Sequence, residues 1–188
     1  MKMFDYFYNK FLMKYYKVQY GNDFTCIGRL IVQGHGDYKF GNHVTIYSKE
    51  TVNPIGGNRT VFQTLDGGKI RVGSYVGMSH AILSSRSEIR IEDYVLIGAY
   101  AKIFDHDFHS LCYEQRIKEE DLHVSSKPVC IKEGAFIGAH AMILKGVTVG
   151  KHSIVGAGAV VTRDIPDYEI WAGNPAKFIR IIEMTGNS

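Results

Sequence analysis

The residues best suited to acid–base chemistry are gathered in one short block, Asp105-His106-Asp107-Phe108-His109. An imidazole titrates near neutral pH, so it can take a proton from an attacking group and return it to a leaving group. The carboxylates of Asp105 and Asp107 flank His106, and either would favour its charged form electrostatically. The block therefore predicts general acid–base chemistry at His106.

This block opens a long segment, residues 104–130, which carries three histidines and several acidic residues but no periodic pattern. The chain on either side of it is regular. A long non-periodic loop inside a regular array is uncommon and usually functional. A second irregular segment, residues 48–68, is rich in glycine. We expect contacts to a substrate to come from these two loops.

The element that must position the block is a six-residue repeat, clearest from Ile131 to Pro166. Each six begins with Ile or Val, at positions 131, 137, 143, 149, 155 and 161. A period of six fits neither the 3.6-residue period of a helix nor the alternation of a strand. It fits short strands joined by corners, with three sixes closing one triangular coil of a parallel β-helix. A β-sandwich is disfavoured, because its turn signals would recur every 8–12 residues.

The whole chain is interpreted as a single domain. In order, the expected parts are a cap helix (1–20), first coils (21–103) with the loop at 48–68, the excursion loop (104–130), last coils (131–166) and a C-terminal tail (167–188). Glycines at the second or fourth place of the sixes suit backbone bends with positive φ.

The N-terminal segment carries Phe4, Phe7, Phe11 and Tyr15 at helical spacing, with Lys10, Lys14 and Lys17 around them. This pattern predicts a helix with one aromatic stripe. We favour a helix that lies across the open end of the solenoid, which needs a cap. The alternative is weak contact of residues 1–17 with an anionic membrane surface.

Composition sets further limits. The chain has 188 residues, 45% of them hydrophobic and 22% charged, which is ordinary for one soluble globular domain. A net charge of +3 is too small to favour nucleic acid as a partner. Three cysteines without metal-like spacing favour a reducing, cytoplasmic location. No signal peptide or membrane-spanning stretch is visible.

Three stretches together resemble the hexapeptide-repeat acyltransferases, in the branch of galactoside, maltose and capsular-polysaccharide O-acetyltransferases. They are the repeats at 131–165, the block from Asp105 to Ser110, and the tail Ala172-Gly173-Asn174-Pro175-Ala176-Lys177. The resemblance covers about residues 65–182. It implies an all-β, left-handed parallel β-helix, a homotrimer, acetyl-CoA as acyl donor in the groove between neighbouring prisms, a sugar or glycan acceptor, and no metal.

The resemblance also implies roles for single residues. His106 aligns with the catalytic histidine, the general base for direct transfer in a ternary complex. The Ala139 amide is the candidate oxyanion donor. His109, Asp105 and Asp107 are candidate acceptor contacts. The candidate contacts to coenzyme A are Gly138, Ala139, Ala157, Thr162, Arg163, Lys177 and Arg180. Sequence neighbours seldom reach the far nitrogen of an imidazole, so a backbone carbonyl is a candidate for the group that orients His106.

The chain departs from the family pattern in two places. Its N-terminal segment is shorter than in maltose-type enzymes, so their acceptor site is not inherited, and Phe136 stands where many relatives have Trp. Three alternatives stay open: a xenobiotic or amino-sugar acetyltransferase of the same fold, a γ-type carbonic anhydrase-like metal enzyme, and a non-catalytic trimeric scaffold. The metal enzyme would draw on His80, His106, His109 and His140, although His80 is better interpreted as structural.

Overall fold

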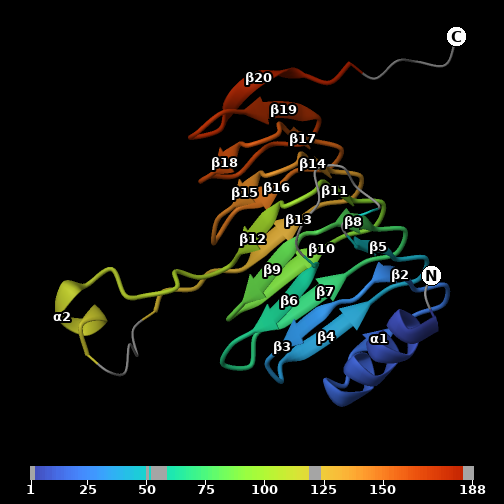
Figure 1. The fold of residues 1–188 in the computed structure, drawn as a ribbon. Coiled ribbons are helices and arrows are strands. Elements are labelled where there is room, and N and C mark those ends of the chain that lie inside the picture. Colours follow the sequence, from blue (N-terminus) through green and yellow to red (C-terminus); the bar gives the residue numbers. More distant parts are fainter. Residues whose placement is uncertain (1–2, 50, 52–58, 119–123, 184–188) are drawn as a thin grey trace, which may run out of the picture.

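Three parallel sheets surround one hydrophobic interior and form a left-handed parallel β-helix (Figure 1). The repeat predicts the parallel β-helix, and the family resemblance implies its left hand. The computed structural model describes residues 3–49, 51, 59–118 and 124–183. Successive strands pass from the first sheet to the second and the third, and then return to the first one coil further along. Each coil therefore stacks on the previous one through parallel pairing.

The strands are short, and each sheet takes every third one. Sheet A holds β1 (Gln19–Tyr20), β4 (Asp37–Phe40), β7 (Lys69–Val72), β10 (Glu88–Ile91), β13 (Val129–Ile131) and β16 (Thr148–Val149). Sheet B holds β2 (Thr25–Gly28), β5 (Thr45–Ser48), β8 (Gly77–Ser79), β11 (Leu96–Ile97), β14 (Phe136–Ile137), β17 (Ile154–Val155), β19 (Glu169–Ala172) and β20 (Lys177–Ile181). Sheet C holds β3 (Ile31–Gln33), β6 (Val61–Thr64), β9 (Ile82–Ser85), β12 (Lys102–Phe104), β15 (Met142–Ile143) and β18 (Val160–Val161).

The aliphatic residue that opens each six lines the interior, as predicted. The six residues Ile131, Ile137, Ile143, Val149, Val155 and Val161 are all fully buried. Parallel register stacks them in columns along the prism, so that Ile97, Ile137 and Val155 lie one above another. Burial of a side chain of this size stabilises the fold by about 1.5–3 kcal/mol, so the columns are the main source of stability.

The glycines serve two purposes, of which only one was expected. Gly134 has φ +67°, the left-handed conformation predicted for a corner. Gly138 has no positive φ; a Cβ placed on it would lie 2.5 Å from the Ala157 amide nitrogen of the next coil. Gly150 is in the same situation, since its Cβ would lie 2.4 Å from the Asp167 amide nitrogen. At these two places glycine is needed because the coils approach closely, not because the backbone bends.

Helix α1 (Met3–Tyr15) packs on the first coil with a largely polar face. Its buried residues are Asp5, Asn9 and Met13, while the aromatic stripe is exposed. The Asn9 side chain donates to the Gly28 carbonyl at 2.7 Å and accepts from the Leu30 amide at 3.0 Å. The open end of the prism therefore offers unpaired backbone groups, and a polar face of α1 satisfies them.

The excursion loop forms an arm that leaves the prism after β12 and returns before β13 (Figure 1). Its neck is a short antiparallel pairing: the Asp107 amide donates to the Ser125 carbonyl at 2.9 Å, and the Lys127 amide donates to the Asp105 carbonyl at 2.8 Å. The short helix α2 (Tyr113–Arg116) lies in the outer part of the arm. The other predicted loop is shorter than expected, because β6 already begins at Val61; positions 50 and 52–58 lie outside the described residues.

Candidate active site

His106 lies directly after β12, at the point where the arm leaves sheet C. Its side chain is fully buried, and its ring packs on that of Phe108 with 4.7 Å between centroids. Its Nδ1 atom is 3.0 Å from Asp105 Oδ1. Its Nε2 atom has no hydrogen-bond partner in the described part of the chain. A buried nitrogen left without a partner costs free energy, so its retention suggests a functional reason.

The group that orients His106 is the neighbouring carboxylate, not the backbone carbonyl that the sequence suggested. Asp105 is buried and accepts hydrogen bonds from the Ser85 hydroxyl at 2.7 Å, the Arg86 amide at 2.7 Å and the Ser87 amide at 2.8 Å. Burial raises the pKa of the Asp105 carboxyl, but the hydrogen bonds from His106 and from these three donors outweigh it and hold the pKa below its ordinary value.

An ionised Asp105 fixes the state of the imidazole. The carboxylate can only accept, so Nδ1 of His106 donates its proton to Asp105. The neutral ring then carries its lone pair on Nε2, which is the atom that can accept a proton from a substrate. Because both oxygens of Asp105 are occupied and the side chain is buried, Asp105 positions His106 and is badly placed to contact an acceptor.

Asp107, on the other side of His106, points to a different partner. It forms an ion pair with Lys145, which follows β15 in the adjacent coil. Each of these two side chains is only about a quarter exposed. His109 is further along the arm and is exposed. The structure thus brings Asp105, His106, Asp107 and Lys145 together at one edge of sheet C.

The candidate contacts to coenzyme A lie elsewhere on the chain. Gly138, Ala139 and Ala157 follow β14 and β17, at the corner between sheets B and C. The amide nitrogens of Ala139 and Ala157 donate to no other group in the described ranges. Sheet C is parallel, so this corner lies where its strands begin, whereas His106 lies where its strand ends. One sheet width separates the two sets within a single chain.

The cationic candidates are near the C-terminal end of the prism. Thr162 and Arg163 follow β18, and the Arg163 guanidinium lies 5.4 Å from the centre of the Trp171 ring. Lys177 and Arg180 are exposed on β20. The pairing of β20 with β19 is antiparallel and closes sheet B.

Sequence reasoning missed Ser85 and Lys145. Ser85 lies one coil before Asp105, and Lys145 lies in the coil that follows the arm. The signal that could have found them is the coil register, which pairs Phe104 with Ser84 and Ile103 with Ile143. A lysine in a solenoid is ordinarily solvated, so its residue type alone gave no hint.

The four histidines that a metal enzyme would use, His80, His106, His109 and His140, lie in two separate places in the described part of the chain. His80 and His140 lie on either side of Tyr100 in a ring stack, with centroid distances of 5.9 and 5.1 Å, at the corner between sheets B and C. His106 lies at the opposite edge of sheet C. Within the described ranges, no three His, Cys, Asp or Glu side chains are grouped so that they could hold a metal ion.

The six-residue repeat matches a known family model. Residues 131–163 match the family model of the bacterial transferase hexapeptide (six repeats). A 2,3,4,5-tetrahydropyridine-2,6-dicarboxylate N-acetyltransferase of Staphylococcus aureus (strain JH9) is 54% identical over 56 residues. These residues make up 30% of this chain and 23% of that protein, so the chain matches about a quarter of the length of this curated relative.

Solved structures show the same fold over most of the chain. The hexapeptide-repeat-containing acetyltransferase VCA0836 from Vibrio cholerae, complexed with acetyl coenzyme A, aligns with a TM-score of 0.63 and 23% identity over 93% of this chain and 77% of that one. A mutant of AntD, an N-acyltransferase from Bacillus cereus, in complex with dTDP-4-amino-4,6-dideoxyglucose and coenzyme A, aligns with a TM-score of 0.74 and 20% identity over 94% and 91% of the two chains. The likeness establishes the left-handed β-helix.

Proposed function

We propose that the chain is an acetyl-CoA-dependent acetyltransferase that uses His106 as its general base and a hydroxyl of a sugar or glycan as its acceptor. The observation that carries this proposal is the buried imidazole whose Nδ1 is bound to an ionised carboxylate and whose Nε2 has no partner in the described chain. The similarity of residues 131–163 to the hexapeptide transferase model supports acyl transfer as the reaction.

The proposed reaction is a single direct transfer. His106 Nε2 takes the proton of the acceptor hydroxyl as its oxygen attacks the thioester carbonyl. A backbone amide, for which Ala139 is the candidate, stabilises the tetrahedral oxyanion. The carbon–sulfur bond then breaks, and the imidazolium returns its proton to the leaving thiolate. Asp105 stabilises the transient imidazolium, and a positioned base of this kind contributes roughly 10²–10⁴ in rate.

A sugar suits the surroundings of His106. Phe108 packs on the imidazole, yet 51% of its surface is exposed. An exposed aromatic face can pack on the apolar C–H face of a sugar ring. The ion pair of Asp107 with Lys145 supplies hydrogen-bonding groups for hydroxyls beside that ring.

We propose that the site is completed by a second copy of the chain in a homotrimer. His106 and the Ala139 corner lie at opposite edges of sheet C, so one chain does not bring them together. A neighbouring prism would place its own corner opposite His106. Pantetheine carries two amides. The backbone amides of Ala139 and Ala157, which donate to no group in the described chain, and the lack of a side chain at Gly138 suit its passage. Arg163, Lys177 and Arg180 would meet the phosphates, beside the hydroxyl of Thr162.

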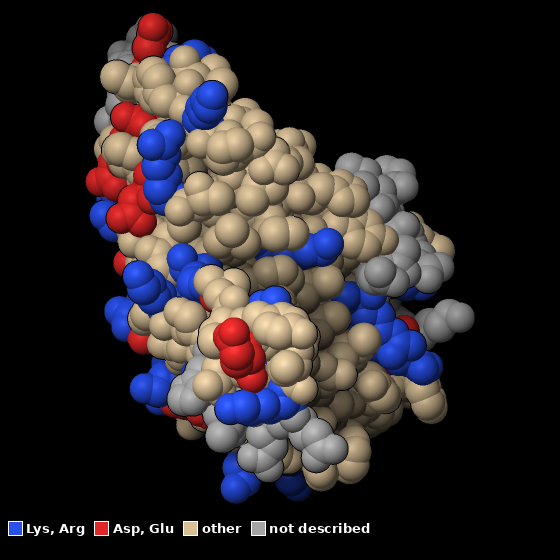
Figure 2. Space-filling view, turned by 90° about the vertical axis from the view of Figure 1, so that its left-hand side faces the viewer, with Lys and Arg blue, Asp and Glu red and all other residues tan. Residues whose placement is uncertain are grey.

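The outer faces of the prism support this assembly. On sheet B, Leu96 pairs with Phe136, and they are 55% and 43% exposed. On sheet C the outward column is also largely apolar: Ile31, Val61, Ile82, Met142 and Val160 are half-buried, with Lys102 among them. On sheet A the outward side chains are charged: Lys39, Arg71 and Arg90 lie in one column, beside a second column of Asp37, Lys69 and Glu88. Figure 2 shows a broad uncharged surface beside an edge lined with charged side chains. Apolar faces of this extent favour burial against another copy.

The experiment that tests the function measures release of free coenzyme A from acetyl-CoA with a panel of sugars and glycans. Wild-type protein should release thiol with at least one hydroxyl acceptor, and His106→Ala should lose roughly 10²–10⁴ in kcat. His35→Ala, which removes an exposed histidine of the first coil, serves as the matched control and should retain the larger part of the rate. Full turnover by His106→Ala would show that the assigned base is wrong.

A second candidate is N-acyl transfer to an amino sugar carried on a nucleotide. It is favoured by the fold likeness to the Bacillus cereus N-acyltransferase, which extends over 94% of this chain. Pairs of acceptors that differ only in a hydroxyl or an amine at one sugar position distinguish the two. An amide product formed in preference to an ester would favour this second candidate.

A further inference from the structure

We propose that helix α1 docks the protein on the surface of an anionic lipid bilayer. This inference goes beyond acetyl transfer and concerns the opposite end of the prism from the coenzyme A candidates. It rests on three properties of α1: which face is exposed, which charges surround that face, and how the helix is held.

The exposed face of α1 is aromatic. Phe4, Phe7, Phe11 and Tyr15 follow one another at spacings of three, four and four residues, and they are 65%, 59%, 70% and 58% exposed. Met3 adds to the same region with 77% exposure. A cap helix that served the prism alone would bury such residues, because removal of each phenylalanine side chain from water would stabilise the fold.

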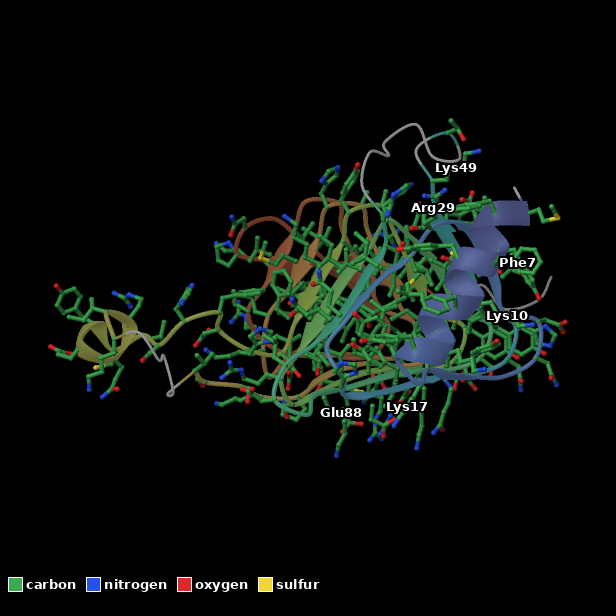
Figure 3. The ribbon with its side chains drawn as sticks, turned by 60° about the horizontal axis from the view of Figure 1, so that its bottom comes forward. Phe7, Lys10, Lys17, Arg29, Lys49 and Glu88 are labelled. Carbon is green, nitrogen blue, oxygen red and sulfur yellow. The ribbon has the colours of Figure 1, made fainter. Side chains whose placement is uncertain are left out.

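The orientation of α1 is fixed by polar contacts. Asn9 bonds two backbone groups of the first coil, and Asp5 forms a 2.8 Å ion pair with Arg29. Met13 completes the buried face. The helix thus buries two polar side chains and keeps its phenylalanines outside, and Phe7 points away from the prism in Figure 3. This inversion needs a partner for the aromatic face.

The charges around the stripe are basic. Lys10, Lys14, Lys17 and Lys49 make no ion pair within the part of the chain that the structure describes. Every acidic residue between positions 3 and 49 is already engaged: Asp5 with Arg29, Asp23 with His43, and Asp37 with Arg71 and Lys39. Figure 3 shows Lys10, Lys17, Arg29 and Lys49 around the end of the prism that carries α1. The charges of Lys10, Lys14, Lys17 and Lys49, which no acidic side chain in the described part of the chain compensates, complement an anionic surface.

The combination specifies a bilayer surface. Phenylalanine beside lysine is the composition of helices that lie in the membrane interface, with rings in the acyl boundary and ammonium groups at the phosphates. The 13 residues of α1 extend about 20 Å, less than the roughly 30 Å of a hydrocarbon core. No helix among the described residues is long and apolar enough to cross a bilayer. Helix α1 therefore lies on the membrane.

The proposed trimer would strengthen this contact. Prisms packed side by side in parallel present three α1 helices at one end of the assembly. Three weak contacts made at once bind far more tightly than one. This step depends on the trimer, whereas docking by α1 itself does not.

The test is flotation of the full chain with vesicles of phosphatidylcholine, alone or mixed with phosphatidylglycerol. Wild-type protein should float with the mixed vesicles and far less with the neutral ones, and added salt should release it. Phe7→Ser should lower the bound-to-free ratio roughly tenfold or more. Lys10→Gln/Lys14→Gln should lower it about fivefold for each lysine.

Matched controls separate this effect from a general change in surface. Tyr94→Ser removes a 57% exposed aromatic side chain elsewhere on the prism, and Lys132→Gln/Lys151→Gln removes two lysines far from α1. Both controls should float like wild type. Absence of wild-type flotation with anionic vesicles, or equal flotation with neutral ones, would overturn the proposal. So would a fall in oligomer mass caused by Phe7→Ser without any vesicle binding, because the stripe would then join copies of the chain. The assay contains no acetyl-CoA, so its failure leaves the proposed enzyme untouched.

Discussion

Asp105 is the residue on which the proposed site depends most, because it decides what His106 can do. It accepts from the imidazole and from three further donors, and these hydrogen bonds keep it ionised in a buried place. Without that charge, nothing would select the tautomer that leaves Nε2 free. The pair is thus a base and its positioning group, built from adjacent residues at the corner where the arm begins.

Replacement of Asp105 by Asn should separate catalysis from binding. An amide can donate to Nδ1 and thereby stabilise the wrong tautomer, so kcat should fall by about 10² or more while the affinity for coenzyme A stays close to that of wild type. Steady-state thiol release gives kcat, and a thermal-shift titration with coenzyme A gives the affinity. Ser85→Ala removes one donor to Asp105 and should cost much less. An unchanged kcat in Asp105→Asn would contradict the role given to Asp105.

The lowered pKa of Asp105 also predicts a pH dependence of stability. A carboxyl whose pKa is lower in the folded than in the unfolded state stabilises the fold above the unfolded value, about 3.9, and loses this contribution as pH falls through the folded value. The free energy of unfolding of wild type should therefore exceed that of Asp105→Asn at neutral pH. Urea titrations from neutral to acid pH should show the difference shrinking below about pH 4. A difference that stays constant would contradict the assigned ionisation.

At the scale of elements, much of the molecule follows from the sixes. The first residue of each six-residue repeat must be aliphatic because its side chain lies in the interior of the prism. The sequence alone predicts this. The partners of the two flanking carboxylates were not predictable in this way, because Ser85 reaches Asp105, and Lys145 reaches Asp107, from other coils through coil register. The sequence did not indicate which face of α1 packs on the prism. The prism end exposes the Gly28 carbonyl and the Leu30 amide, and satisfying them outweighed burying phenylalanine.

The close contact between coils predicts that alanine costs much more stability at one glycine than at another. Gly138→Ala places a Cβ 2.5 Å from the Ala157 backbone nitrogen, which cannot move without its coil, so the free energy of unfolding should fall by about 1–3 kcal/mol. In Gly77→Ala the new Cβ meets only the end of the Leu96 side chain, at 3.0 Å. The free energy of unfolding should therefore change by less than about 0.5 kcal/mol. Chemical denaturation of both variants checks this. Equal costs would show that coil spacing does not dictate glycine at position 138.

At the scale of the whole molecule, the prism has distinct sides and ends. Sheets B and C carry apolar outer columns, sheet A carries charges, α1 presents an aromatic and basic end, and β20 presents cations near the other end. Packing through sheets B and C would leave sheet A in water and bring the corner of one copy to the arm of the next. The edge of sheet C that carries His106 and the corner that carries Ala139 would then come from different copies of the chain.

Mixed assemblies test this shared site most directly. His106→Ala removes the base, and Ala139→Trp blocks the proposed pantetheine corner, so each variant alone should be inactive. Equal amounts unfolded and refolded together should recover about a quarter of wild-type thiol release, since that fraction of interfaces in random cyclic trimers combines an intact His106 with an intact neighbouring Ala139. If the mixture stays as inactive as its components while still forming trimers, the base and the corner act within one chain, and the shared site is contradicted.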